Sequence, residues 1–155
     1  VVVFGDCPLI DPLIVDEMIA AFHADDELDF LGNDLKTTYP PGMDVEVFRV
    51  AALSDSARRT TDAEMREHGT LYLRLHPDIY RIKNVEAPEH LRRPDLLLGL
   101  DTLEDLEVIT AVFKHFQQSA NFGLVEIIDF LDGHPELREK NKKVFRRWRQ
   151  YRQDN

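Results

Sequence analysis

The chain has 155 residues, of which 43% are hydrophobic and 31% charged, and its net charge is −10. This length suits one domain with a substantial core, and the composition is typical of a soluble globular protein. No apolar run approaches the roughly 20 residues that span a bilayer, and no signal peptide is visible. The single Cys7 excludes an intramolecular disulfide and a cysteine-based metal cage. We therefore expect a cytoplasmic protein.

The charge is unevenly distributed along the chain. Residues 138–155 contain eight Lys and Arg against two acidic residues, a net charge of about +6, which leaves about −16 for the rest. An acidic body argues against nucleic acid as a general partner. An acidic surface is instead consistent with a site that binds phosphate groups through metal ions.

The first twelve residues combine a short apolar run with a carboxylate. Val1 to Phe4 predict a fully buried strand of the kind found inside a parallel sheet, and Asp6 follows its end. Because ligands of open α/β sheets bind beyond the carboxyl ends of strands, Asp6 is a candidate for holding a hard cation that carries a phosphate. The alternative is that Asp6 only caps the turn or the next helix. Pro12 is well placed to open that helix.

The remaining pattern predicts mixed helices and strands. We expect helices over 12–24, 50–57 and 60–68, with 69–75 continuing the last, and further helices over 102–116 and 121–131. We expect strands over 28–33, 43–48 and 79–85. Leu96 to Leu100 predict a second buried strand that ends in a carboxylate, Asp101. Thr102 and Asp105 then form the pattern of a capping box.

Acidic residues alternate with apolar ones in Met43 to Phe48. This alternation predicts a strand with one wet face, shared by Asp44 and Glu46. That face is either a plain solvated surface or a wall that contacts a polar ligand such as a sugar. The preceding loop ends in Pro40-Pro41-Gly42, which fixes its shape.

Residues 136–155 form a basic tail that is helical by propensity. Val144, Phe145, Trp148 and Tyr151 mark one apolar stripe on it. The stripe favours packing on this domain or on a partner, and contact with nucleic acid or a membrane is the alternative.

Several segments, taken in order, resemble one family. They are Gly5-Asp-Cys-Pro-Leu-Ile-Asp-Pro12, Tyr39-Pro-Pro-Gly-Met-Asp-Val-Glu-Val-Phe48, Arg66-Glu-His-Gly-Thr70, His76-Pro77, Ile82-Lys-Asn-Val85 and Leu100-Asp-Thr-Leu-Glu-Asp-Leu106. Together they closely resemble the cytidylyltransferases of the spore-coat polysaccharide SpsF type, relatives of the CMP-KDO and CMP-sialic acid synthetases. The resemblance covers about residues 1–135, and the tail 136–155 lies outside it.

The resemblance implies a fold and a chemistry. The fold is an α/β, three-layer α/β/α Rossmann-like sandwich of the nucleotide-diphospho-sugar transferase type. The reaction transfers CMP from CTP to an acidic or other sugar and releases pyrophosphate. By motif position, Asp6 and Asp101 are the catalytic residues and the Mg²⁺ ligands. The resemblance places the acceptor-binding residues at Tyr39, Gly42, Asp44, Glu46, Glu67 and His68.

The chain also departs from the family pattern. The family opens with a strand and a glycine-, arginine- and lysine-containing nucleotide loop, and neither is present before Val1. The chain begins on a strand without Met, so we expect it to be the C-terminal portion of a nucleotidyltransferase domain, over 1–135, that lacks the N-terminal strands. Leu103 stands where the family usually has Pro, and Gly99 where Thr is common.

Three functional hypotheses remain at this point. The first is the metal- and sugar-binding part of a CMP-sugar synthetase-like enzyme, with little activity of its own because no CTP cradle is visible. The second is a non-catalytic remnant of that fold that acts in assembly or partner binding. The third is a domain that binds a sugar phosphate without nucleotide chemistry. CTP and a sugar are the expected partners. A homodimer is a further alternative that the sequence does not decide.

Overall fold

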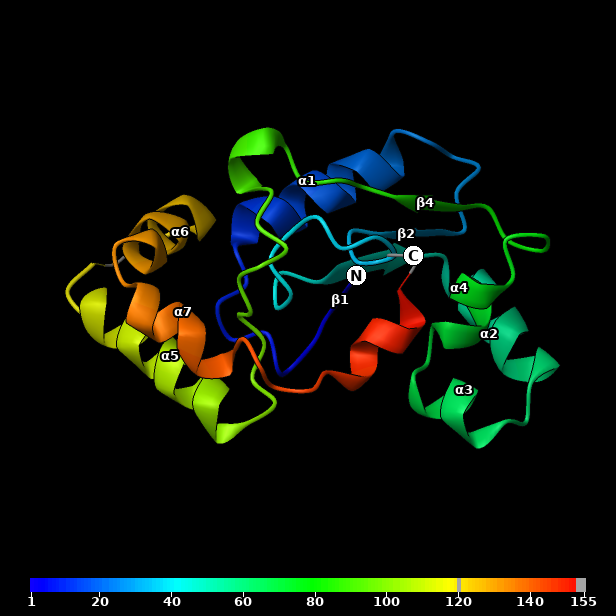
Figure 1. The fold of residues 1–155 in the computed structure, drawn as a ribbon. Helices are drawn as coiled ribbons and strands as arrows, with labels where there is room; N and C mark the ends of the chain where they lie inside the picture. Colours follow the sequence, from blue (N-terminus) through cyan, green and yellow to red (C-terminus); the bar gives the residue numbers. More distant parts are fainter. Residues whose placement is uncertain (120, 153–155) are drawn as a thin grey trace.

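A computed structural model of the chain describes residues 1–119 and 121–152, and the last three residues of the expected tail lie outside this part (Figure 1). Its sheet contains β1 (Val2–Val3), β2 (Phe30–Gly32), β3 (Val45–Phe48) and β4 (Ile82–Asn84), in the order β1-β3-β2-β4. β3 is antiparallel to both of its neighbours, and β2 and β4 are parallel. The sheet is therefore mixed, and the expectation that Val1 to Phe4 form a buried strand of a parallel sheet is wrong.

The sheet separates two apolar cores. Leu31, Val45 and Val47 point to the larger core, which also contains residues of α1 (Pro12–His23). Phe30, the neighbour of Leu31 in the strand, points to the smaller core with Ala52 and Leu73, because successive side chains of a strand face opposite sides. Helices thus cover both faces, as expected for an α/β/α sandwich.

Helix α1 follows directly from its sequence. The Asp11 side chain accepts a hydrogen bond from the Leu13 amide at 2.9 Å, and Pro12 is the first helical residue. This is the expected start, since proline lacks the amide that an N-terminal turn leaves unpaired. Ile14, Met18 and Phe22 recur every four residues and are buried.

Three helices follow β3, namely α2 (Val50–Arg59), α3 (Ala63–Glu67) and α4 (Leu71–Leu75). α2 and α4 supply residues to the smaller core, whereas α3 has no buried residue. The expected single helix over 60–75 is therefore divided in two. Asp62 caps α3, and its side chain accepts a hydrogen bond from the Met65 amide at 3.0 Å. A short 3₁₀ helix, η1 (Glu89–Leu91), follows β4.

The C-terminal part adds α5 (Leu103–His115), α6 (Leu124–Asp132), α7 (Pro135–Asn141) and the 3₁₀ helix η2 (Arg147–Tyr151). The capping box of Thr102 and Asp105 at the start of α5 is confirmed. The tail is not one helix, because α7 ends at Asn141 and η2 begins six residues later. None of the described helices is long and apolar enough to cross a membrane.

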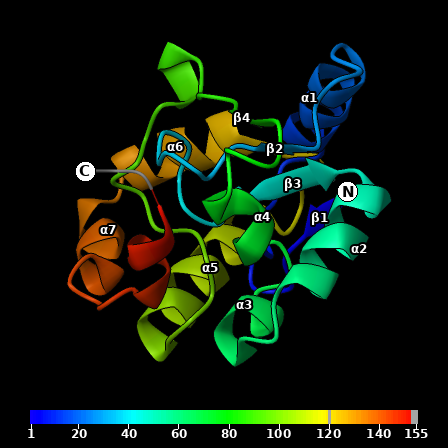
Figure 2. The ribbon, with the colours of Figure 1, turned by 90° about the vertical axis from the view of Figure 1, so that its right-hand side faces the viewer.

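The tail crosses the molecule. Figure 1 shows α5, α6 and α7 on one side and α2, α3 and α4 on the other, with the red C-terminal segment running between them. The view turned by 90° again places this segment between α7 and α4 (Figure 2). The expected apolar stripe does not form, because Phe145 is 87% exposed while Trp148 is partly covered.

Two expected buried strands differ in the structure. Val1 to Phe4 form only the two-residue edge strand β1, and Val3 and Phe4 are 40% and 38% exposed. Leu96, Leu97 and Leu98 are buried as expected, but the segment from Leu96 to Leu100 forms no strand. Burial predicted from an apolar run was correct for the second segment, while strand pairing depends on neighbours that the run does not reveal.

Candidate active site

Backbone hydrogen bonds bring Asp6 and Asp101 to the same place. The Leu100 amide donates to the Asp6 carbonyl at 2.8 Å, and the Leu98 amide donates to the Pro41 carbonyl at 2.7 Å. The segment before Asp101 is therefore held between Asp6 and the Pro40-Pro41-Gly42 loop without belonging to the sheet. Asp6 and Asp101, which are 95 positions apart in the sequence, thus line a common pocket.

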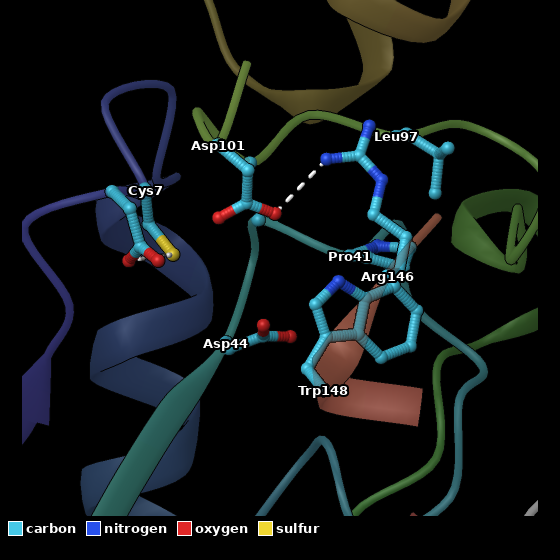
Figure 3. Close-up of a pocket in the computed structure, with 10 residues that line it drawn as sticks. Cys7, Pro41, Asp44, Leu97, Asp101, Arg146 and Trp148 are labelled. Carbon is cyan, nitrogen blue, oxygen red and sulfur yellow. Dashed lines mark hydrogen bonds and ion pairs between the residues drawn. The ribbon is translucent and has the colours of Figure 1, made fainter. Parts of the chain in front are cut away.

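This pocket, which we call the small pocket, has a volume of about 30 Å³. Figure 3 shows Asp44, Asp101, Arg146 and Trp148 around it. Its lining also includes further polar and backbone groups. The complete lining is Asp6, Cys7, Pro41, Gly42, Asp44, Leu97, Gly99, Asp101, Arg146 and Trp148.

The small pocket adjoins a much larger cleft of about 800 Å³, and Asp6, Asp44, Asp101 and Trp148 line both. A volume of this size is typical of small-molecule sites. Six carboxylates line the cleft: Asp6, Asp34, Asp44, Glu46, Glu67 and Asp101. Arginines Arg74, Arg147 and Arg152 line it as well.

Gly42 shapes the small pocket through its backbone. Its φ is +105°, and a Cβ at this position would lie 2.3 Å from the Gly99 amide nitrogen. Only glycine adopts such a φ at little cost and allows so close an approach. Gly42 therefore acts as a spacer that lets the segment preceding Asp101 reach the loop.

Asp105 organises the edge of the small pocket. It is fully buried, and it accepts hydrogen bonds from the Asp101 and Thr102 amides, from Asn141 at 2.8 Å and from Arg146 at 2.8 Å. Burial opposes ionisation of Asp105, but the hydrogen bonds from Arg146 and Asn141 outweigh it, and its pKa falls to about 2. Asp105 is thus a fixed anion that anchors the tail.

Glu46 is buried, so the solvated face expected for β3 is wrong at this position. Its side chain is 1% exposed, accepts hydrogen bonds from Thr70, and pairs with Arg74 at 3.0 Å. Arg74 also pairs with Asp34, at 2.9 Å. Burial and the nearby Asp34 raise the pKa of Glu46 to about 7, although Arg74 and Thr70 lower it. The alternation of β3 therefore marks a buried ion cluster at the cleft.

The tail forms a wall of the cleft. Arg152 pairs with Asp44 at 2.9 Å, donates to Thr37 at 3.2 Å, and lies 4.1 Å from the centre of the Trp148 ring. Burial raises the pKa of Asp44 to about 6, and the charge of Arg152 moderates this increase. Tyr151 donates to Glu64, and its ring lies 4.9 Å from that of His68. These contacts tie the tail both to the loop that precedes β3 and to α3.

The predicted acceptor residues have different positions. Asp44, Glu46, Glu67 and His68 line the cleft, and Gly42 lines the small pocket. Tyr39 lines neither, because its side chain is 3% exposed and packs in the larger core. The structure thus brings most of these residues together around one space, and their roles stay predictions.

Asp6 and Asp101 suit Mg²⁺ in their donor chemistry. Mg²⁺ binds through one or two carboxylates and keeps several waters, so it needs no full protein cage. Among the described residues there is no cluster of three or more His, Cys, Asp or Glu with metal-site geometry. The third acidic residue of the small pocket, Asp44, is paired with Arg152. Asp101 is also paired, with Arg146, but through its Oδ2 atom alone. Asp6 and the second oxygen of Asp101 thus remain for a hydrated cation, which fits the ion.

Several residues of the site were not anticipated from the sequence. Arg74 is an arginine within an apolar run, Leu71 to Leu75, and that unusual placement is the signal that could have found it. The tail arginines Arg146 and Arg152 carried a weaker signal, because their helical propensity suggested a regular surface helix. Their contacts depend on residues that are 45 and 108 positions away in the sequence.

Comparison with known proteins gives consistent relatives. No family model matches the chain. It is 36% identical over 137 residues to the spore coat polysaccharide biosynthesis protein SpsF of Bacillus subtilis, covering 85% of the chain and 54% of that protein. It is 33% identical over 112 residues to the uncharacterized protein MJ1063 of Methanocaldococcus jannaschii, covering 72% and 45%.

A solved structure supports the same relationship. The cytidylyltransferase from Leptospira borgpetersenii superposes with a TM-score of 0.80 at 28% identity, covering 92% of this chain and 58% of that one. The fold is therefore that of a cytidylyltransferase-like nucleotidyltransferase. By sequence and by fold, the chain is a homologue of the SpsF-type cytidylyltransferases, as the sequence motifs predicted. It spans about half the length of the curated relatives it matches.

Proposed function

We propose that this chain carries the metal- and acceptor-binding part of a cytidylyltransferase that transfers CMP from CTP to a sugar in polysaccharide or glycan biosynthesis. The observation that supports this most directly is the position of Asp6 and Asp101 on one small pocket that adjoins the large cleft. The homology to SpsF supports the reaction class.

Asp6 and Asp101 have the role of holding Mg²⁺ in this proposal. When bound, the ion would neutralise phosphate charge and favour in-line transfer to the sugar hydroxyl. Asp105 and its hydrogen bonds keep the backbone amides of Asp101 and Thr102 in place. The chain's own contribution is thus a pair of carboxylates at the edge of the cleft, with the backbone of Asp101 held in place by Asp105.

The acceptor sugar occupies the cleft in this proposal. Glu67 and His68 at the end of α3, Asp44 just before β3 and Glu46 in β3 supply polar groups for its hydroxyls. Arg147 is an exposed cation on the same cleft and suits a carboxylate of an acidic sugar. The tail wall limits the size of the sugar that can enter.

The CTP cradle is expected outside these residues. The glycine-, arginine- and lysine-bearing loop of the family does not occur among the 155 residues. Positioning contributes several kcal/mol to such transfers, so we propose that residues 1–155 alone turn over little CTP. We assign the reaction to the cytoplasm, where CTP is available.

Pyrophosphate release from CTP tests the reaction. The full-length protein, with Mg²⁺ and a panel of acidic sugars, is expected to release pyrophosphate, and Asp6→Asn and Asp101→Asn should each reduce the rate at least about 100-fold. Asp16→Asn, on the exposed side of α1, makes the same change away from the site and should be neutral. Release that persists in both site variants would contradict the proposal. Robust turnover by residues 1–155 alone would mean that a phosphate site lies within them.

The acceptor assignment has a separate test. Saturating acceptor sugar should shift the backbone NMR signals of residues 39–46 and of Glu67 and His68 in the full-length enzyme. Signals of α6 serve as the reference, because α6 does not line the cleft. If both predicted segments kept their positions while activity was present, the sugar would bind elsewhere.

A further inference from the structure

Arg146 reaches the small pocket from the tail. Its side chain is 2% exposed and pairs with Asp105, which is fully buried. The same guanidinium donates from Nη1 to Oδ2 of Asp101 at 2.9 Å. One planar cation thus connects the anchor of the tail to a carboxylate of the proposed metal site.

The contact engages one oxygen of Asp101 and not the other. Figure 3 shows the Oδ2 atom directed at Arg146, while the second oxygen points to the side of the pocket where Cys7 lies. Asp6 precedes Cys7 and lines the same pocket. Arg146 therefore holds one oxygen of Asp101 and leaves the other on the side of the small pocket where Cys7 lies.

The arrangement does not cancel the charge of Asp101. Arg146 makes two hydrogen bonds to Asp105, from Nη1 and Nη2, and one to Asp101. The Arg146–Asp105 pair is close to neutral as a unit, so Asp101 keeps its negative charge for a cation. Asp105 is fixed in turn by Asn141 and by backbone amides, so the guanidinium has little freedom to turn away.

Carboxylates that bind metals are commonly oriented by such outer hydrogen bonds. Loss of one typically costs 10- to 100-fold in metal affinity or activity. We propose that Arg146 is a positioning residue of the metal site, which fixes Asp101 in the orientation that binds Mg²⁺. This rests on the proposed function, because it takes Asp6 and Asp101 as the ligands. It assigns the tail, outside the segments that carry the family resemblance, a part in building the site.

The alternative is that Arg146 only anchors the tail on α5. The two roles predict different measurements. An anchor changes the free energy of unfolding, whereas a positioning residue also changes the metal affinity of protein that is still folded. Metal affinity must therefore be measured alongside stability.

Binding of Mn²⁺, followed by its EPR signal, provides the readout without any turnover. The wild-type protein is expected to bind one ion, and Asp101→Asn to abolish that binding. Arg146→Gln should weaken binding 10- to 100-fold. Arg146→Lys keeps the charge but not the planar guanidinium group, so its Mn²⁺ affinity should fall between those of the wild type and Arg146→Gln. Lys143→Gln removes an exposed tail cation that does not line the small pocket, and should match the wild type within about twofold.

The fluorescence of Trp148, the one tryptophan in the sequence, and thermal unfolding establish that each variant is folded. If Arg146→Gln does not fold, Arg146→Lys carries the comparison. Folded Arg146 variants with wild-type affinity would overturn the positioning role and leave the metal site intact. A wild-type protein that binds no Mn²⁺ would overturn the metal assignment itself, and this inference with it.

Discussion

Gly42 packs directly against the backbone of Gly99, and this contact joins the two segments that form the small pocket. A Cβ on Gly42 would lie 2.3 Å from both the Gly99 nitrogen and the Leu98 carbonyl carbon. The reverse is not true, since a Cβ on Gly99 would meet its nearest atoms at 3.8 Å. The interface therefore depends on one glycine and tolerates a side chain on the other.

This asymmetry predicts different outcomes for two alanine substitutions. Gly42→Ala forces a residue with a Cβ into φ +105° and into backbone atoms, so we expect a loss of about 2–4 kcal/mol in the free energy of unfolding. Gly99→Ala meets only ordinary van der Waals contacts and should change it by less than about 1 kcal/mol. Urea denaturation of both variants measures the difference. Equal losses would mean that the loop relaxes away from Gly99.

Glu46 predicts a dependence of stability on pH. Its pKa is raised from 4.5 to about 7 in the folded protein, chiefly by burial. The folded state thus holds the proton more tightly, so this stabilisation is fully present below pH 4.5 and is lost as the pH rises to about 7. The change is on the order of 1–3 kcal/mol. Thermal unfolding between pH 4.5 and 8 measures it.

Glu46→Gln should remove most of this dependence, because glutamine has no proton to lose. Glu136→Gln makes the same chemical change on the exposed side of α7 and should keep the wild-type profile. Asp44 contributes in the same direction over a lower range, since its pKa is also raised, to about 6. A Glu46→Gln profile as steep as that of the wild type would contradict the prediction.

Arg74 should be critical for stability. Its side chain is 11% exposed and pairs with two buried carboxylates, Asp34 and Glu46. Arg74→Met leaves both without their cation, and breaking a buried pair in this way costs about 3–5 kcal/mol. Arg59→Met removes an exposed ion pair with Asp55, which should cost less than about 1 kcal/mol. Chemical denaturation of the two variants side by side provides the comparison.

The Arg74 variant also has an internal check. Adding Glu46→Gln to Arg74→Met removes one stranded charge, so the double variant should be more stable than Arg74→Met alone. If the second substitution brought no recovery, the loss would come from packing of the arginine side chain.

Local signals allowed much of the fold to be predicted. The start of α1 at Pro12 and the Thr102 and Asp105 capping box depend on residues within one helical turn, and both were confirmed. Asp6 and Asp101 do line one pocket, but they do not meet at the edge of a parallel sheet, and their role as metal ligands stays a prediction. The strand expected before Asp101 was wrong, because its backbone bonds to loops that the local pattern does not specify.

The acidic face of β3 and the tail were harder to predict for the same reason. Alternation in β3 identified the strand, but the burial of Glu46 depends on Arg74, which is 28 residues away. The tail sequence has high helical propensity, yet Arg146 and Arg152 lie outside any regular α-helix. They pair instead with Asp105 and Asp44. Ion pairs between distant segments override local preference here.

Arg152 should control how the tail closes on the cleft. It pairs with Asp44 and covers the Trp148 ring at 4.1 Å, so Arg152→Gln removes an ion pair and a cation–π contact worth about 0.5–2 kcal/mol. The pKa of Asp44 should then rise further above 6, because burial remains and the neighbouring positive charge is gone. The indole should become more exposed to water, which shifts its emission to longer wavelength.

Fluorescence measures this without a label, because Trp148 is the one tryptophan in the sequence. Lys143→Gln removes the same charge from an exposed position of the tail that does not line the cleft, and its spectrum should match that of the wild type. A pH titration of the emission then separates the two effects. In Arg152→Gln the spectral change that follows ionisation of Asp44 should have its midpoint at higher pH than in the wild type. Identical midpoints and emission maxima in the two proteins would show that Arg152 holds neither Asp44 nor Trp148 in solution.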